Sequence, residues 1–99
     1  MKMTTFGPIG LNALTVSSAV QTALSQLGEK PKLAVIYPPV GADYAAIVSA
    51  IKKVADEPVI GATTGGAGFT EKGIALNALV GGFISGDDVS VSTAVIKDL

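Results

Sequence analysis

Residues 33–39 read LAVIYPP: five consecutive apolar residues, Leu33 to Tyr37, stop abruptly at two prolines. A short apolar run without alternation is typical of a strand covered on both faces, as in a parallel sheet. A second such run extends from Pro58 to Ala62, and the segment between the two runs has helical periodicity. The pattern predicts two parallel strands joined by a helix.

Two stretches carry apolar residues at helical spacing. The first covers residues 15–28, with Thr15 or Ser17 as the expected N-cap and Gly28 as the expected C-cap. The second covers residues 43–55, with Asp43 as the expected N-cap. The stripes predicted to face the core are Val16, Ala19, Val20, Ala23, Leu24 and Leu27 in the first helix, and Tyr44, Ile47, Val48, Ile51, Val54 and Ala55 in the second.

The second half of the chain has a different residue pattern. Residues 63–73 are rich in turn-forming residues, and residues 74–84 form a longer apolar run. Residues 89–96 alternate apolar and polar side chains, as in a half-exposed antiparallel strand. Between these two strand candidates, residues 85–88 (SGDD) have the composition of a hairpin turn.

The N-terminal stretch, residues 2–12, adds one more strand before the first helix. The predicted order is therefore β-α-β-α-β-β-β, in a single domain over residues 1–99. This is an α/β fold that leans towards α+β, with two helices and a mixed sheet that is parallel early and antiparallel late.

The composition is unusually apolar, with 48% hydrophobic and 15% charged residues, against a usual charged share of about 25%. We expect part of the apolar surface to be covered by another copy of the chain or by a partner domain, so a homo-oligomer is predicted. The basic residues are seven scattered lysines, of which only Lys52 and Lys53 are adjacent. Because nucleic-acid binding needs a basic stripe, no nucleic-acid partner is expected.

The chain has no histidine, no cysteine and no arginine. Ser–His and Cys–His nucleophiles, zinc sites built on thiolate or imidazole, and bidentate arginine clamps are thereby excluded. We therefore predict no catalytic residue, no metal, no cofactor and no enzymatic activity. The N-terminus lacks the apolar core of a signal peptide, and residues 74–84 are too short to span a membrane. A soluble cytoplasmic protein without a membrane partner is the expectation.

The glycine-rich stretch GATTGGAG, residues 61–68, follows the second buried strand at the edge of the sheet where α/β proteins usually bind ligands. It is neither a Walker loop nor a dinucleotide fingerprint, because Lys-Ser/Thr does not follow the glycines and a strand follows where a helix is needed. The alternative is a flexible strand connection. The predicted ligand-binding residues are Gly61, Thr63, Thr64, Gly65 and Gly66, together with Tyr37 and Asp43 from the loop after the first buried strand.

Some of these residues also have a purely structural interpretation. Asp43 is a plausible helix cap and Tyr44 a plausible core residue. Asp87 and Asp88 are adjacent carboxylates without further oxygen ligands, which favours a hairpin turn over a cation site.

Pro58 to Gly66, PVIGATTGG, resembles a strand and turn of the N-terminal FIST (F-box and intracellular signal transduction) domain. Residues 19–24 and 33–37 stand where that family has an alanine-rich helix and a strand, and residues 73–95 where it has a hairpin. The family often carries cysteine at the place of Ala62 and an acidic residue near Ala67, and the chain corresponds only to the early part of the family domain. The resemblance implies a sensory module for small, amino-acid-like molecules, linked to signalling.

The sequence thus leads to a first hypothesis, a small-molecule-binding sensory domain without catalytic activity. The alternative is a structural or self-assembly module with an apolar oligomer interface and no ligand. A third hypothesis is a small enzyme that uses Thr63 or Thr64. A pocket formed by the two loops would favour the first hypothesis, and a flat apolar interface the second.

Overall fold

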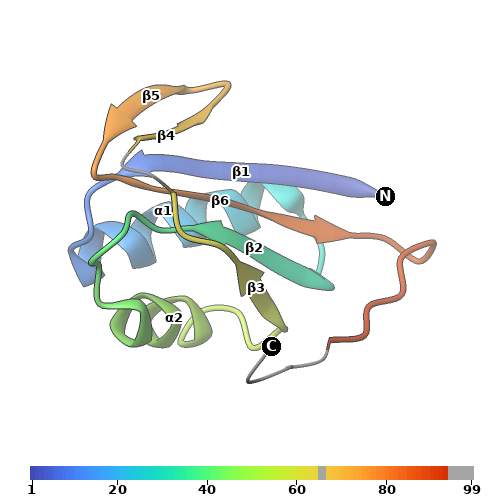
Figure 1. Cartoon of the computed structure of the whole chain (residues 1–99). Coiled ribbons are helices and arrows are strands. Elements are labelled where there is room, and N and C mark those ends of the chain that lie inside the picture. Colours follow the sequence, from blue (N-terminus) through green and yellow to red (C-terminus); the bar gives the residue numbers. More distant parts are fainter. Residues whose placement is uncertain (65–66, 94–99) are drawn as a thin grey trace.

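The computed structural model describes residues 1–64 and 67–93, which form a four-stranded sheet, two helices and a separate two-stranded hairpin (Figure 1). The elements in chain order are β1 (Lys2–Ile9), α1 (Ala13–Leu27), β2 (Leu33–Tyr37), α2 (Tyr44–Lys52), β3 (Val59–Gly61), β4 (Ala67–Thr70), β5 (Gly73–Leu76) and β6 (Leu79–Ser85). The predicted α+β class with two helices is confirmed.

The sheet is mixed, with the strand order β1-β6-β2-β3. Strands β2 and β3 pair in parallel, with Val35 beside Ile60, whereas β6 pairs antiparallel with both β1 and β2. Because β6 is antiparallel to both of its neighbours, β1 and β2 run in the same direction on its two sides. The last strand of the described chain therefore lies in the middle of the sheet.

Both helices lie on one face of this sheet. Each connects two strands that run in the same direction, β1 to β2 through α1 and β2 to β3 through α2. Such crossovers are almost always right-handed, and two that step across the sheet in the same sense place their helices on the same face. Figure 1 shows α1 behind β1 and β6, and α2 near β2 and β3.

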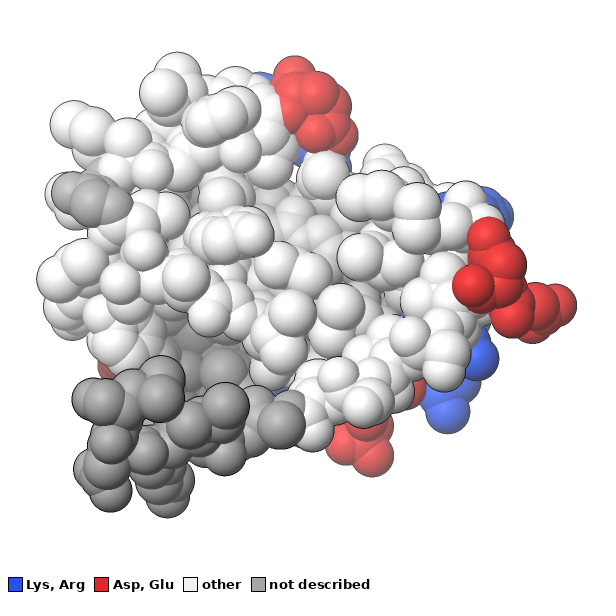
Figure 2. Space-filling model, turned by 45° about the vertical axis from the view of Figure 1, so that its right-hand side comes forward, with Lys and Arg blue, Asp and Glu red and all other residues white. Residues whose placement is uncertain are grey.

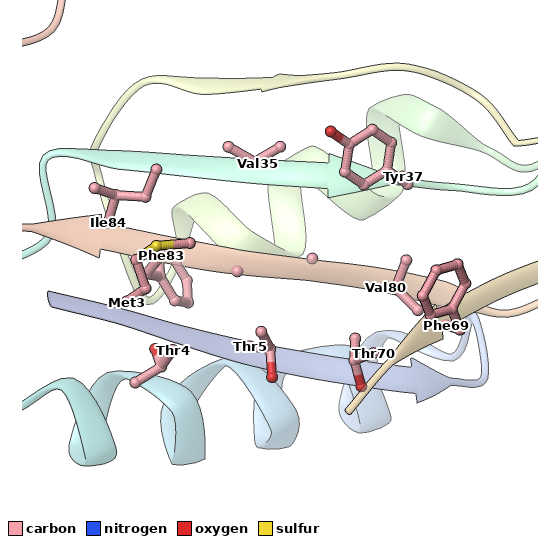
Figure 3. A pocket seen from close by; sticks show the side chains of 12 residues that line it. Met3, Thr4, Thr5, Val35, Tyr37, Phe69, Thr70, Val80, Phe83 and Ile84 are labelled. Atoms are coloured by element: carbon pink, nitrogen blue, oxygen red, sulfur yellow. The ribbon is translucent and has the colours of Figure 1, made fainter. Parts of the chain in front are cut away.

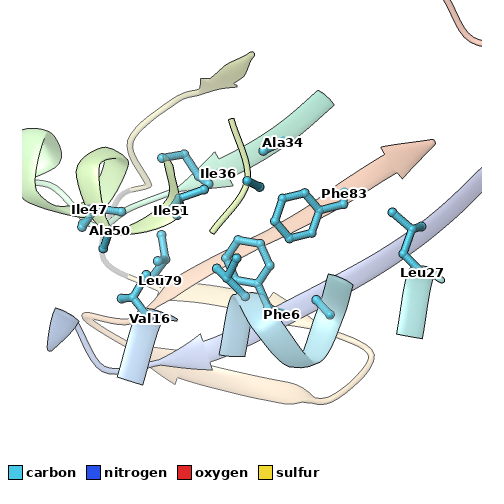
Figure 4. Packing of buried hydrophobic residues seen from close by; sticks show 13 residues of the cluster. Phe6, Val16, Leu27, Ala34, Ile36, Ile47, Ala50, Ile51, Leu79 and Phe83 are labelled. Carbon is cyan, nitrogen blue, oxygen red and sulfur yellow. The ribbon is translucent and has the colours of Figure 1, made fainter. Parts of the chain in front are cut away.

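The core lies between these helices and the sheet (Figure 4). Every second residue of a strand points to this face, so β6 contributes Leu79 and Phe83, both fully buried. The rings of Phe6 and Phe83 are 5.5 Å apart at their centroids. The helices contribute Val16, Val20, Ala23 and Leu27 from α1, and Ile47, Ala50 and Ile51 from α2. Six of these seven residues belong to the stripes predicted from the sequence, and Ala50 does not.

The caps agree in part with the predictions. Asp43 caps α2 by accepting a hydrogen bond from the Ala46 amide at 3.1 Å, and Gly28 ends α1 with a φ of 74°. The predicted N-cap of α1 is wrong, because the Asn12 side chain accepts from the Leu14 amide at 2.8 Å and the helix begins before Thr15.

Helix α2 differs from its prediction in two respects. It ends at Lys52, shorter than the predicted range. The prediction of a core Tyr44 is wrong: its side chain is 40% exposed, and its hydroxyl accepts a hydrogen bond from the Gly41 amide at 3.0 Å. Tyr44 to Ala46 are exposed, so the buried stripe of α2 begins at Ile47.

The expectation that the buried strands are covered on both faces is wrong. Among the described residues, both helices cover one face, and the opposite face is open except where the β4–β5 hairpin lies against β1 and β6. Tyr37, on the open face, is 44% exposed, whereas the preceding Ile36 is 5% exposed. The continuous apolar run of β2 thus belongs to a sheet that helices cover on one face only.

The run predicted as a single strand over residues 74–84 is two strands. Asn77 has a φ of 51°, in the left-handed region that asparagine tolerates, and the chain turns there between β5 and β6. The preceding segment, predicted as a loop over residues 63–73, contains β4, which pairs antiparallel with β5 through the turn at Glu71 and Lys72. The hairpin of this region therefore lies earlier in the chain than predicted.

The strand predicted over residues 89–96 is not found in its described part, Val89 to Thr93, and residues 94–96 lie outside the described chain. The turn itself is present, since the Val89 amide donates to the Gly86 carbonyl at 3.1 Å. The hairpin fails because β6 already has β1 on one side and β2 on the other. A strand that continued directly from this turn would find no free edge on β6.

Candidate functional site

The open face of the sheet carries a hollow of about 360 Å³ (Figure 3). Strands β1, β2 and β6 form its floor, and the β4–β5 hairpin closes one end. Its lining residues are Met3, Thr4, Thr5, Val35, Tyr37, Phe69, Thr70, Val80, Gly81, Gly82, Phe83 and Ile84. Gly82 of β6 lowers the floor at its middle, because no side chain rises there, whereas Gly81 faces the Phe6 ring on the covered face.

Two aromatic rings stand at one end of this hollow. Tyr37 at the end of β2 is 44% exposed, and Phe69 on β4 is 74% exposed. Figure 3 shows both rings at the same end of the floor, near Val80 on β6. A flat apolar molecule could contact these rings and the aliphatic floor together, since aromatic faces stack favourably on other rings.

The polar groups of the hollow are mostly engaged within the protein. The Thr70 hydroxyl donates to the Gly7 carbonyl at 2.7 Å, and the Thr5 hydroxyl donates to the Glu71 carboxylate. The Lys72 ammonium group donates to the Thr5 carbonyl. These bonds hold the β4–β5 turn against β1, so they fix the position of Phe69 at the rim.

The hollow is uncharged. None of the twelve residues that line it is acidic or basic. In the view of Figure 2, the charged side chains lie at the margin of the molecule, and the middle of the visible surface is uncharged and hollowed. The Glu71 carboxylate and the Lys72 ammonium group are both hydrogen-bonded to Thr5, so the lining itself offers no counter-charge to an ionic ligand.

A second depression, of about 310 Å³, lies at the carboxyl ends of β2 and β3, where the sequence predicted a site. It lies between β3 and α2. Its lining residues are Ile36, Pro38, Tyr44, Val48, Val59, Ile60, Gly61, Ala62 and Thr63. We call it the edge depression. It brings together Gly61 and Thr63 of the predicted site, with Pro38 and Tyr44 from the neighbouring loop and helix.

The other predicted site residues are separated from this edge depression. Tyr37 points to the opposite face and lines the open-face hollow, and the Asp43 carboxylate is occupied as the cap of α2. The Thr64 amide donates to the Pro38 carbonyl at 2.9 Å, and the Thr64 hydroxyl oxygen is buried without a hydrogen-bond partner among the described residues. Gly65 and Gly66 lie outside the described residues.

Two carboxyl groups have a lowered pKa, and both are exposed. A hydrogen bond from the Thr5 hydroxyl lowers the pKa of Glu71. A hydrogen bond from the N-terminal ammonium group to Asp88 Oδ2, at 3.0 Å, lowers the pKa of Asp88. Both shifts favour the charged form on the surface, which is the opposite of what a general acid needs.

The described residues offer neither a metal-binding group nor a membrane-spanning helix. Residues 1–64 and 67–93 contain no group of three or more histidine, cysteine, aspartate or glutamate side chains placed to hold a metal ion. In the same part of the chain, neither helix has the length and apolar character needed to cross a membrane.

Comparisons with known proteins do not identify the chain: no protein-family model, no curated protein and no solved structure matches it. The resemblance to the FIST domain therefore stays an expectation from the sequence. The class supported by the fold is a small α+β protein with a one-sided sheet.

Of the residues that line the open-face hollow, only Tyr37 was predicted from the sequence as a site residue. Met3 and Thr5 alternate with Thr4 and Phe6, which is a half-buried strand pattern that was available in residues 2–9. No local signal places Phe69 over β6, because this contact depends on the fold of the β4–β5 hairpin.

Proposed function

We propose that this chain is a non-catalytic binding module that takes a small, uncharged and largely apolar molecule in the open-face hollow. The observation that carries the proposal is a depression of about 360 Å³ without a charged lining residue, flanked by Tyr37 and Phe69. Ligand pockets of this kind usually measure about 300–1,000 Å³ and are lined mainly by apolar and aromatic side chains.

The chemistry of the lining favours binding over catalysis. General acid–base catalysis needs a titratable group within hydrogen-bond reach of the reacting atoms. The polar side-chain groups of the hollow are the hydroxyls of Thr5, Thr70 and Tyr37, since the Thr4 hydroxyl donates to the Ala23 carbonyl of α1 on the covered face. A role as a sensory domain, in which the bound molecule is detected for signalling, is part of the same proposal and rests on the resemblance at residues 58–66.

The preferred ligand differs from the amino-acid-like molecule that the resemblance implied. An amino acid carries an ammonium and a carboxylate group, and burying either without a partner is costly. The open-face hollow provides no such partner. An uncharged aromatic or aliphatic compound fits its lining better.

The test is thermal unfolding of the protein against a panel of small aromatic, aliphatic and amino-acid compounds. A ligand that binds only the folded state raises the unfolding midpoint. We expect an uncharged apolar compound to raise it in the wild type and to lose this effect in Phe69→Ala. The matched control is Ile74→Ala, because Ile74 lies opposite Phe69 in the hairpin, is 73% exposed and does not line the hollow.

A panel in which no compound raises the wild-type midpoint would contradict the proposal. Equal shifts in the wild type and in Phe69→Ala would place the ligand elsewhere on the molecule. A response confined to charged amino acids would contradict the proposed ligand chemistry.

A second candidate function is self-assembly through the open face. Apolar side chains extend beyond the hollow, since Ile60 is 44%, Ile74 73% and Leu76 76% exposed. None of these three residues lines the hollow, so a single small ligand there would leave them exposed, and a large exposed apolar surface is typical of protein interfaces. If this function holds, Val35→Lys on the open face lowers the sedimentation-derived mass to that of a monomer.

A further inference from the structure

The two edges of the four-stranded sheet are β1 and β3. At the β1 edge, the Thr5 carbonyl accepts from Lys72 and the Gly7 carbonyl accepts from Thr70. Side chains of the β4–β5 turn thus form hydrogen bonds with two β1 carbonyl groups that would otherwise be available to another strand. Natural sheets protect their edges by such covers, by charged side chains or by proline.

Within residues 1–64 and 67–93, the β3 edge has no such cover. The extended segment runs beyond β3 to Thr64, which forms a parallel bridge with Pro39. Residues 59–64, VIGATT, include neither a charged residue nor a proline. An uncharged edge of this length, without a neighbouring strand among the described residues, is a ready template for pairing with another strand.

The hydrogen bonds within the sheet show which groups of this edge are free. The Ala62 amide donates to the Ile36 carbonyl at 3.3 Å, and the Thr64 amide donates to the Pro38 carbonyl at 2.9 Å. In a parallel ladder, alternate residues direct both backbone groups at the neighbouring strand. The backbone N–H and C=O groups that point outwards, away from β2, are therefore those of Val59, Gly61 and Thr63. Within residues 1–64 and 67–93, no backbone group pairs with them.

We propose that this edge pairs antiparallel with the same edge of a second copy, around a two-fold axis at Gly61. Hydrogen bonds between the two copies require that residues with free backbone groups face one another, and these are Val59, Gly61 and Thr63. Gly61 therefore faces Gly61 of the second copy, and Val59 faces the second copy's Thr63. Three N–H donors from each copy then make about six hydrogen bonds. The two sheets join into one continuous sheet of eight strands, an isologous contact of the commonest symmetry.

The charges beside this edge are compatible with this occupant. Helix α2 runs antiparallel to β3, since it connects two parallel strands, so Asp43 lies at the Thr63 end. At the Val59 end, Lys52 and Lys53 are balanced by Asp56 and Glu57. Antiparallel pairing places each Asp43 beside the balanced end of the other copy, whereas parallel pairing would bring the two Asp43 carboxylates together, and like charges disfavour that arrangement.

The edge depression fits the same arrangement. It runs along β3 beside Tyr44 and Val48, and none of its lining residues is charged. A second copy at this edge would cover apolar surface that α2 leaves exposed. Because the axis is perpendicular to the sheet, both open-face hollows stay accessible on the same side, so the pairing goes beyond the proposed function and is compatible with it.

The experiment combines sedimentation with amide hydrogen exchange of the full chain over a range of protein concentrations. We expect a concentration-dependent dimer, and about tenfold or more slower exchange at the Val59, Gly61 and Thr63 amides as the dimer fills. The control amide is Met3 on the outer side of β1, whose exchange stays constant. A monomer at all concentrations overturns the proposal. Association with unchanged exchange at these three amides also overturns it, and then points to the open face.

A variant pair gives an independent check. Thr63→Pro removes one outward donor from each copy, whereas Thr63→Val keeps the amide and removes only the hydroxyl. Two lost hydrogen bonds should weaken the dimer about tenfold or more, and Thr63→Val should dimerise as the wild type does. Equal dimer affinity of Thr63→Pro and the wild type overturns the proposal, and the exchange data on the wild type decide it if Thr63→Pro fails to fold.

Discussion

The two faces of the sheet use similar residues for different purposes. On the covered face, Ile36 and Phe83 are 5% and 0% exposed and pack against the helices. On the open face, their chain neighbours Val35 and Ile84 are only partly buried and line the hollow. The comparison teaches that the apolar character of a strand does not decide which of its side chains stabilise the fold, because the placement of the helices does.

The largest expected effect is on the covered face. Ile36→Ala removes buried methyl and methylene groups from the core and should lower the free energy of unfolding by about 2–5 kcal/mol. Val35→Ala, one residue earlier on the open face, should lower it by about 1 kcal/mol or less. Denaturant unfolding of both variants measures the difference. Equal losses would show that the open face is as well packed as the covered one.

A smaller effect concerns the helix that covers the sheet. Asn12 caps α1 by accepting from the amides of Leu14 and Thr15. Asn12→Ala should therefore lower the free energy of unfolding by about 1 kcal/mol. Thr15→Ala, at the cap position that the sequence predicted, should change it by about 0.5 kcal/mol or less, because Thr15 is exposed inside the helix. A larger loss in Thr15→Ala would contradict the observed start of α1.

The smallest effect belongs to the open face and depends on pH. The Thr5 hydroxyl stabilises the charged Glu71 carboxylate, so the pKa of Glu71 is lower in the folded state than in the unfolded chain. This contribution to stability is fully present above the unfolded pKa, about 4.3, and is lost as the pH falls through the folded pKa. An NMR titration should show the low pKa of Glu71 in the wild type and a return towards the ordinary value in Thr5→Val. An unchanged pKa in Thr5→Val would contradict the hydrogen bond.

Elements with a strong local signal were predicted well. Strand β2 has the predicted bounds, because two prolines end an apolar run unambiguously. Asp43 and Gly28 were identified as caps, since a short acidic side chain and a glycine suit those positions for local reasons. Asn12 was missed because several residues near the start of α1 are able to cap a helix.

The candidate site was predicted less well. Gly61 and Thr63 lie together at the expected edge of the sheet, but Tyr37 lies on the other face. A strand alternates its side chains between two faces, so neighbours in sequence that leave one strand need not share a pocket. Phe69 reaches the hollow only through the β4–β5 hairpin, which local sequence patterns do not position.

The sequence by itself determined the α+β class, the two helices and their buried stripes, and the absence of histidine, cysteine and arginine chemistry. These properties depend on local periodicity and on residue identity. Only the tertiary structure decided that β6 enters the sheet between β1 and β2. That insertion uses both edges of β6, so residues 89–93 cannot pair with it. The tertiary structure also places both helices on one face of the sheet, which leaves the hollow open on the other face. Strand order results from pairing between residues far apart in the chain, and local propensity carries no information about that pairing.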